Sequence, residues 1–313
     1  MLKNLIKGGH NDYIMLKLYI HMIKYYEIGK ILFKVDVFES ECFCERMSAY
    51  EISPVEHVDV NVRIILTGAL SYDSTYKVIG STAYRGYGVK DGNYAIFDKL
   101  YSADKLSAAL YINNSCTEIV GYLVDIEHLG GANKGIRAYS MIGEAFKYVA
   151  LVNNGFVFHS STIDYNGKGI LFSADSGTGK STHTQQWLKY YPYETRIIND
   201  DTPFIRIIKG KSYVFGTPWS GKSDLNLNVV VPLDTIVFLE RGLECSIENL
   251  DFRTAFDKFV RQSFILPFTN LFMSYLNLAE KVLKTTKISL LRCNISKKAV
   301  DTVKNHLEAN GEN

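Results

Sequence analysis

Short apolar runs alternate with polar connectors over the first 130 residues. Three of these runs are typical of β-strands: 31–38 (ILFKVDVF), 60–68 (VNVRIILTG) and 118–126 (EIVGYLVDI). In the first run apolar and polar side chains alternate with a period of two, which places them on opposite faces of a sheet. Connectors that contain Asp, Ser and Gly separate the runs. The pattern predicts an α/β amino-terminal domain over residues 1–130, without a catalytic constellation and of unknown role.

A helical period follows the glycine-rich segment 130–135 (GGANKG), which we interpret as the boundary of a second domain over residues 131–313. Apolar residues return on one face of a helix over 136–149, and 153–155 (NNG) is a stop signal. Asn166-Gly167 between two apolar runs predicts a two-residue hairpin turn. We expect further helices from near Gly179 and over 253–263, 271–283 and 297–307, and strands over 156–159, 169–172, 196–198, 204–208, 213–215 and 235–239.

Composition indicates an ordinary globular protein. The 313 residues are 47% hydrophobic and 22% charged, with a formal net charge of +2. Basic residues are dispersed, so neither nucleic acid nor a membrane is expected as a partner. The apolar segment 14–23 is interrupted by Lys17 and His21 and is too short to span a bilayer, so we expect a core helix or a strand there. Five cysteines lack metal-ligand spacing, and their odd number fits a reducing cytoplasm.

One segment, 173–184 (SADSGTGKSTHT), contains the parts of a phosphate-binding P-loop. A triphosphate is held by backbone N–H groups at a helix amino terminus, by a lysine on the outer phosphates and by a hydroxyl on the metal ion. Lys180 fits the lysine and Ser181 the Mg²⁺ ligand, while the glycines allow a tight loop. An apolar run precedes the loop and a helical pattern follows it. The residues expected to contact the nucleotide are Ser176, Gly177, Thr178, Gly179, Lys180, Ser181 and Thr182.

The loop departs from the usual spacing at one position. Ala174 stands where the first glycine of a P-loop is usual. Because alanine is small, the loop can form if the φ angle of Ala174 is negative. The alternative interpretation is a glycine-rich turn with an incidental Gly-Lys-Ser.

Paired acids follow the next predicted strand. Asp200 and Asp201 end the run 196–201 (RIINDD), where the carboxyl end of a strand would place them beside the loop. One acid would coordinate Mg²⁺ and the other would take the proton of a phosphoryl acceptor. The alternative is a solvated turn before Pro203.

Two further residues are weaker candidates. His159 lies in an apolar run, where a histidine is as well explained by core packing as by catalysis. Lys222 belongs to a second glycine segment, 216–223 (GTPWSGKS), and is a candidate to neutralise the transferring phosphate or an acidic acceptor. A plain surface loop explains Lys222 equally well.

The stretch 158–205 resembles the catalytic core of HPr serine kinase/phosphorylase, in which a strand with His, a hairpin, a phosphate loop, a helix and a strand ending in paired acids follow one another. It is also similar to the phosphate loop of PEP carboxykinases. The segments 216–222 and 231–242 look like those of bacterial HPr-kinase-like proteins, some of which are associated with modifying ribosomally made peptides. The similarity covers roughly residues 150–240.

This resemblance implies an α/β P-loop core with a mixed sheet, ATP and Mg²⁺ as cofactors, and assembly into homo-oligomers. It implies that Asp200 activates the acceptor with help from His159, and that Ser181 and Asp201 hold the metal ion, although the two acids could exchange roles. The amino-terminal region and the helix start 181–184 (STHT) depart from HPr kinases. HPr is therefore not the expected acceptor, and the chain is short for a carboxykinase.

We therefore expect a cytoplasmic kinase that transfers the γ-phosphoryl group of ATP to a hydroxyl of a peptide, a protein or a small molecule such as serine. The alternative is a nucleotide-binding regulator without phosphotransfer. A sensor does not need a base beside a metal ligand, so the acid pair favours the kinase. A stand-alone hydrolase would instead need a positioned water.

Overall fold

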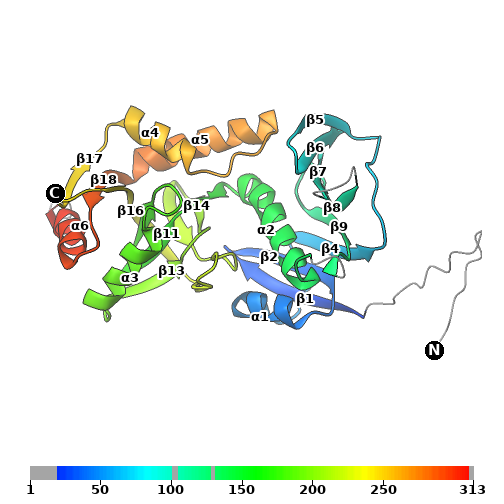
Figure 1. Cartoon of the computed structure of the whole chain (residues 1–313), viewed down its shortest axis with the longest axis horizontal. Coiled ribbons are helices and arrows are strands. Elements are labelled where there is room, and N and C mark those ends of the chain that lie inside the picture. The colour runs from blue at the N-terminus through cyan, green and yellow to red at the C-terminus, as the bar shows by residue number, and fades with distance from the viewer. Residues whose placement is uncertain (1–19, 101–104, 128–130, 310–313) are drawn as a thin grey trace, which may run out of the picture.

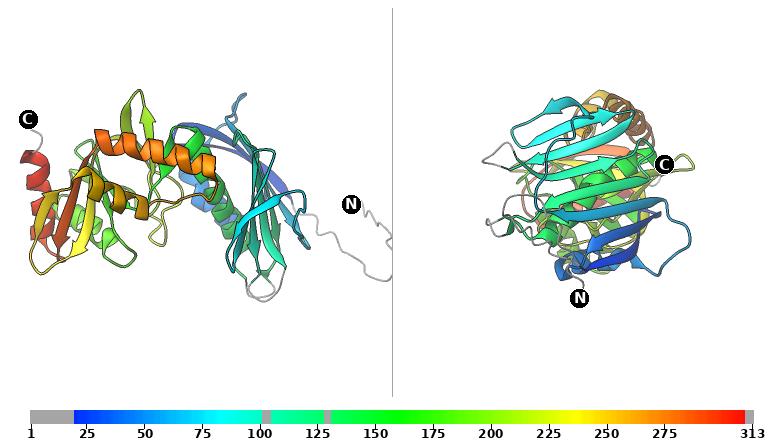
Figure 2. Two further views of the ribbon diagram at one scale, coloured as in Figure 1. Left: turned by 90° about the horizontal axis from the view of Figure 1, so that it is seen from above. Right: turned by 90° about the vertical axis from the view of Figure 1, so that its right-hand side faces the viewer.

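The computed structural model describes residues 20–100, 105–127 and 131–309. Within these ranges the chain forms two nine-stranded sheets and six α-helices, which confirms the mixed α/β fold predicted from the sequence. Figures 1 and 2 show the first sheet at one end of the molecule and the second sheet, with α4 and α6, at the other, while α5 extends from the second sheet toward the first.

The first sheet has the strand order β3-β1-β2-β4-β9-β8-β7-β6-β5. Its pairs are antiparallel except β2 with β4 and β4 with β9, which are parallel. Helix α1 (Glu41–Met47) and a 3₁₀ turn (Ser48–Tyr50) are the helical elements described in this part of the chain. The strands are β1 (His21–Ile28), β2 (Ile31–Phe38), β3 (Glu51–Ile52), β4 (Val60–Thr67), β5 (Lys77–Ser81), β6 (Arg85–Lys90), β7 (Asn93–Lys99), β8 (Leu106–Ile112) and β9 (Glu118–Val124).

The second sheet has the order β10-β14-β15-β16-β12-β11-β13, and β18 pairs with both β16 and β17. Its strands are β10 (Gly155–Val157), β11 (Ser161–Tyr165), β12 (Lys168–Ser173), β13 (Thr195–Asn199), β14 (Phe204–Ile208), β15 (Lys211–Phe215), β16 (Val230–Arg241), β17 (Ser246–Asn249) and β18 (Lys287–Cys293). The remaining helices are α2 (Lys134–Val152), α3 (Lys180–Tyr190), α4 (Phe252–Arg261), α5 (Thr269–Thr285) and α6 (Lys297–Ala309).

Strand directions in the second sheet bring several chain segments to one edge. Strand β11 is antiparallel to both β12 and β13, so β12 and β13 run the same way. Strand β12 is parallel to β16, and β16 is parallel to β18. The carboxyl ends of β12, β13, β16 and β18 therefore lie at the same edge of the sheet. In α/β sheets this edge is where ligands bind.

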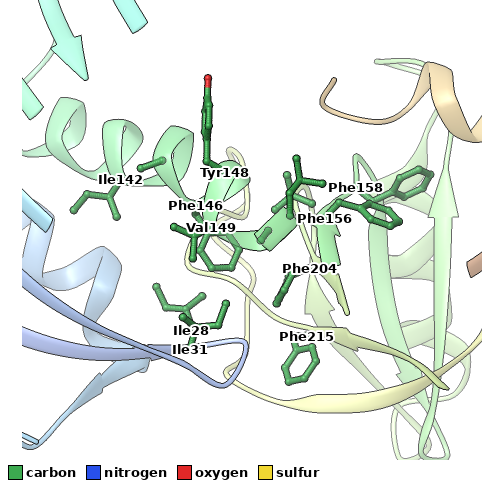
Figure 3. Close-up of a cluster of buried hydrophobic side chains, with 14 of the residues drawn as sticks. Ile28, Ile31, Ile142, Phe146, Tyr148, Val149, Phe156, Phe158, Phe204 and Phe215 are labelled. Atoms are coloured by element: carbon green, nitrogen blue, oxygen red, sulfur yellow. The ribbon is translucent and has the colours of Figure 1, made fainter. Parts of the chain in front are cut away.

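Helix α2 lies between the two sheets and joins their cores (Figure 1). Its Phe146 side chain is 0% exposed. The Phe146 ring centroid is 6.0 Å from that of Phe33 in the first sheet and 5.2 Å from that of Phe204 in the second. Figure 3 shows this cluster, in which residues of both sheets pack around the helix. The domain boundary near residue 130 stays a prediction, and the structure adds that one hydrophobic cluster spans both parts.

The predicted elements are largely confirmed. Runs 31–38, 60–68 and 118–126 correspond to β2, β4 and β9, and the helix expected over 136–149 is α2. The Asn166-Gly167 turn joins β11 to β12 with φ angles of 51° and 80°, as a two-residue hairpin requires. Most of segment 14–23 lies outside the described residues, and its end belongs to β1. Sequence patterns did not predict α1, β3, β5 to β8, β17 or β18. None of the described helices is long and apolar enough to cross a membrane.

The contacts of Phe146 predict that the two sheets depend on one another for stability. We expect Phe146→Ala to lower the free energy of unfolding by about 3–5 kcal/mol, because the truncation leaves a cavity between the sheets. Urea unfolding followed by circular dichroism measures this effect. The control is Val152→Ala on the exposed face of the same helix, which should change stability by no more than about 0.5 kcal/mol. Equal effects of the two variants would contradict the joining role of Phe146.

Candidate functional site

The glycine-rich loop connects β12 to α3 at the shared sheet edge. Its backbone depends on two glycines, Gly177 and Gly179, whose φ angles are +78° and +120°. Side chains are strained at such angles, so glycine is required here for conformation. Ala174 is buried and has no positive φ, so an alanine is tolerated at the position where a first glycine is usual. A glycine-rich loop between a strand and a helix therefore forms despite that departure, and its phosphate binding stays a prediction.

The amino end of α3 points its first N–H groups toward the loop. Gly179 is the N-cap residue and contributes no side-chain cap, and the first turn contains no acidic residue. Ser176, Gly177, Ser181 and Thr182 are exposed, and Thr178 is partly exposed. A helix amino end with uncapped N–H groups favours an anion. The predicted phosphate contacts are thus accessible along one loop.

Lys180 is the most buried cation of the site. The residue is only 8% exposed, and its Nζ donates a hydrogen bond to the Ala174 carbonyl at 2.8 Å. Burial lowers the pKa of the Lys180 ammonium, whereas the nearby carboxylates of Asp201, Asp175 and Asp200 act in the opposite direction. The ammonium is therefore held inside the loop, close to the acid pair.

Asp200 is fixed by a short chain of hydroxyl groups. It is 7% exposed, and the Ser161 Oγ donates to its Oδ1 at 2.5 Å. The same Ser161 oxygen lies 2.8 Å from the Thr184 Oγ1, which is 3.0 Å from the Ser181 carbonyl oxygen. These contacts connect the Asp200 carboxylate to the first turn of α3, which also contains the exposed Ser181.

Asp201 forms the other half of the pair and faces His159. The Asp201 Oδ1 and His159 Nδ1 are 3.5 Å apart. Burial raises the pKa of the Asp201 carboxyl, an effect that His159 and Lys180 oppose and Asp200 reinforces. Burial, followed by the charge of Lys180, lowers the pKa of the His159 imidazole. His159 follows β10 rather than lying within a strand, and this position between β10 and β11 brings its ring to Asp201.

Asn199 holds the backbone of the acid pair in place. It is buried, and its Oδ1 accepts hydrogen bonds from the backbone N–H groups of Asp201 at 2.9 Å and Thr202 at 2.8 Å. Its Nδ2 donates to the carbonyl oxygens of Thr217 at 2.9 Å and Trp219 at 3.2 Å. A single amide thus connects the turn that carries the acids to the second glycine segment.

The second glycine segment is anchored to helices α2 and α1. The Trp219 Nε1 donates to the Tyr139 carbonyl at 2.9 Å, and the Tyr139 hydroxyl donates to the Pro218 carbonyl at 2.7 Å. Directly after the segment, Asp224 forms an ion pair with Arg46 of α1 at 3.1 Å. Helices α1 and α2 therefore fix the position of a loop that borders the acid pair.

Gly221 places this segment directly beside Asp201. A Cβ atom at Gly221, which has a φ of +69°, would lie 3.0 Å from the Asp201 Cβ. The next residue, Lys222, is exposed and has no hydrogen bond or ion pair with the residues that the structure describes. Its ammonium is thus available at the Asp201 side of the site.

Besides Asn199, sequence reasoning missed three residues that shape the site. Ser161 and Thr184 hold Asp200, and Arg241 at the end of β16 donates from its Nη2 to the Gly177 carbonyl at 2.6 Å. Ser161 and Thr184 do occur beside His159 and within the loop segment, but only the strand register indicates that they meet. Arg241 lies beyond the strand predicted over 235–239, so no local signal connected it to the loop.

The acid pair and Ser181 offer the oxygen ligands that Mg²⁺ prefers. Mg²⁺ sites in phosphoryl-transfer proteins use one or two carboxylates together with substrate phosphates and waters. Among the described residues no group of three or more His, Cys, Asp or Glu side chains is arranged to hold a metal ion. Two carboxylates and a hydroxyl beside the glycine-rich loop therefore suit Mg²⁺ that also binds phosphates and waters better than they suit a metal ion held by protein ligands alone.

Two cavities flank the loop. One, of about 390 Å³, is lined by Gly177, Gly179 and the first turns of α3 on one side and by the ends of β16 and β18 on the other. The second, of about 510 Å³, lies between the beginning of the loop, β16 and α4. Arg241 borders both cavities.

Comparison with known proteins gives a distant likeness to solved structures only. No family model matches the chain, and no curated protein matches it. Among solved structures, the HPr(Ser) kinase/phosphatase from Coxiella burnetii is similar at 10% sequence identity and a TM-score of 0.31, over 50% of this chain and 99% of that chain. The likeness is distant and structural only.

The contacts of Asn199 predict that the acid pair loses its support when this amide is removed. We expect Asn199→Ala to lower the free energy of unfolding by about 3 kcal/mol, because several buried backbone groups lose their hydrogen-bond partner. The control is Asn228→Ala, an exposed asparagine with one long hydrogen bond, which should cost no more than about 0.5 kcal/mol. Urea titration measures the free energy of unfolding of both variants. If Asn199→Ala were as stable as Asn228→Ala, Asn199 would not brace the acid pair.

Proposed function

We propose that this protein is a Mg²⁺-dependent kinase that transfers the γ-phosphoryl group of ATP to a hydroxyl group of a peptide, a protein or a small molecule. One observation carries the proposal: the phosphate loop and the acid pair lie at the same sheet edge, with the buried Lys180 ammonium close to both. A loop that only bound an anion would not need a buried acid, a second acid that is partly exposed and a histidine beside it.

The donor phosphates would be bound by the loop and the amino end of α3. Backbone N–H groups around Gly179 and the Lys180 ammonium would offset the charge of the outer phosphates. Ser181 and Asp200 would hold Mg²⁺, since the hydroxyl chain through Ser161 fixes Asp200 against the first turn of α3. Bound there, the metal ion would supply positive charge next to the oxygens of the transferring group.

Asp201 would take the proton of the acceptor hydroxyl, with His159 orienting the carboxylate. The acceptor oxygen forms a bond to the γ-phosphorus, the bond between this phosphorus and the bridging oxygen of the leaving ADP breaks, and the acceptor proton passes to Asp201. The sequence resemblance favours Asp200 as the base, but its contacts suit metal binding better, because one of its oxygens already accepts from Ser161. Asp201 instead faces His159 and has a pKa raised by burial.

The acceptor would approach on the Asp201 side of the loop. Lys222 is exposed on the neighbouring segment and would contact the transferring group or an acidic acceptor. That segment is held by α1 and α2, so residues of the amino-terminal part would shape the acceptor side. Homo-oligomer formation and a cytoplasmic location stay predictions.

The proposal is tested by ATP binding together with phosphoryl transfer. Calorimetry with Mg²⁺ and ATP should show that Lys180→Ala weakens binding by about tenfold or more, because a charge-assisted contact is lost. Transfer of ³²P from γ-labelled ATP to a panel of Ser- and Thr-containing peptides and free serine should fall by about a hundredfold in Asp201→Asn, which should still bind ATP.

The matched control for these variants is Lys189→Ala, an exposed lysine near the end of the same helix, which should leave both binding and transfer unchanged. Unaltered ATP binding by Lys180→Ala would contradict the site. ATP binding by the wild-type protein without transfer to any acceptor of the panel would favour the regulator that the sequence also allows.

The His159–Asp201 pair predicts a pH effect with a defined sign. Transfer needs Asp201 ionised, so its rate should fall as the pH drops through the raised pKa of this carboxyl. His159 lowers that pKa, so His159→Phe should raise it further and move the acidic limb of the pH–kcat/KM profile to higher pH. His57→Phe, an exposed histidine in the first half of the chain, should leave the limb in place. If His159→Phe left the acidic limb of the profile in place or moved it to lower pH, the interaction between His159 and Asp201 would be contradicted.

A further inference from the structure

The cavity of about 390 Å³ beside the loop has the size of a small-molecule site. It opens between the first turns of α3 and the carboxyl ends of β16 and β18. Loop residues Gly177 and Gly179 form one wall, so a ligand in this cavity would be continuous with one bound along the loop. Its other lining residues include Thr182, Gln186, Leu239, Arg241 and Ile295.

The cavity and the acid pair lie on opposite sides of the loop. Along the sheet edge the strand ends follow the order β18, β16, β12, β11 and β13. The cavity borders the ends of β18 and β16, whereas Asp200 and Asp201 follow β13. A triphosphate lying along the loop with its γ end near the acids would therefore direct its other end toward the cavity.

Polar groups in the cavity wall are free to bind a ligand. Within the described parts of the chain the Gln186 amide and the Thr182 hydroxyl make no hydrogen bond, and the guanidinium of Arg241 makes one, to Gly177. Apolar surface comes from Leu239 and from Ile295, which is 74% exposed. An amide that both donates and accepts, next to apolar side chains, suits a flat heterocycle with polar edges.

The second cavity, on the α4 face, is less suited because several of its polar side chains are already paired. Lys258 forms an ion pair with Glu240 at 2.8 Å, and the Gln262 Nε2 donates to the Asp175 Oδ1 at 2.9 Å. A ligand there would have to compete with these contacts, whereas the first cavity offers unpaired groups.

We infer that the cavity between α3 and the ends of β16 and β18 binds the base and ribose of the donor nucleotide, with Gln186 at the base edge and Ile295 against its face. The donor then enters from the β18 side and the acceptor from the β13 side of the loop. This inference rests on the proposed function, since it assumes that the loop holds the phosphates of the same molecule.

The test compares a nucleotide with a phosphate chain that has no nucleoside. Calorimetry of the full chain with Mg²⁺ uses inorganic tripolyphosphate and either ATP or GTP, whichever the wild-type protein binds more tightly. Gln186→Ala and Ile295→Ala should each weaken nucleotide binding by about fivefold, the effect of one ordinary hydrogen bond or apolar contact, and leave tripolyphosphate binding unchanged. Matched controls are Gln185→Ala, the exposed neighbour on α3, and Leu243→Ala, an apolar residue that is 95% exposed. Both should leave nucleotide binding unchanged.

The outcomes separate this inference from the proposed function. Tripolyphosphate binding as tight as nucleotide binding would overturn the nucleoside site and leave the phosphate loop standing. If Gln186→Ala and Ile295→Ala weakened the binding of nucleotide and of tripolyphosphate equally, the nucleoside site would also be overturned. Unchanged nucleotide binding in both variants would overturn it as well. A wild-type protein that binds neither ligand would refute the proposed function, and the nucleoside site with it.

Discussion

The site depends on one constraint of strand direction: β12 and β13 run the same way on either side of the antiparallel β11. This arrangement brings the glycine-rich loop, which follows β12, and the acid pair, which follows β13, to one sheet edge. The start of β11 lies between them, with Ser161 paired to Phe172 and Thr162 to Asn199. That register is why Ser161 reaches both Asp200 and Thr184. A shift of one residue would turn these side chains to the other face of the sheet.

Electrostatics at this edge follows from burial. Lys180, His159 and the two acids are removed from water to different degrees, and attraction between the groups of opposite charge partly offsets the cost of their burial. Burial raises the pKa of Asp201 and lowers those of His159 and Lys180, while their mutual attraction opposes these shifts. Titratable groups whose pKa values are shifted by burial and by specific partners are typical of functional sites.

Local patterns predicted the parts of this site that are continuous in sequence. The loop, the hairpin at Asn166-Gly167 and the helix after the loop follow from glycine positions and apolar periods, because these signals act over a few residues. The same reasoning could not connect His159 with Asp201, or Arg241 with the loop, because those contacts depend on strand order and register. The role of Asn199 was hidden for the same reason, since the acceptors of its Nδ2 group, Thr217 and Trp219, lie beyond two further strands. The sequence left open which acid binds the metal ion and which acts as the base. Their different partners, Ser161 for Asp200 and His159 for Asp201, distinguish the two acids.

The second glycine segment shows how the amino-terminal part takes part in the site. Its contacts with Tyr139 and Arg46 tie the loop beside Asp201 to α2 and α1, and α2 also carries Phe146 between the two sheets. The position of Lys222 therefore depends on packing between the two parts of the chain.

An experimental structure with Mg²⁺ and a non-hydrolysable ATP analogue tests the central claim most directly. The account predicts that the outer phosphates lie within hydrogen-bond distance of the Lys180 Nζ and the N–H groups at the start of α3, with the metal ion on Ser181 and an acid of the pair. A nucleotide found away from the glycine-rich loop, or held there with Asp200 and Asp201 turned away from the metal ion and the γ-phosphate, would contradict it.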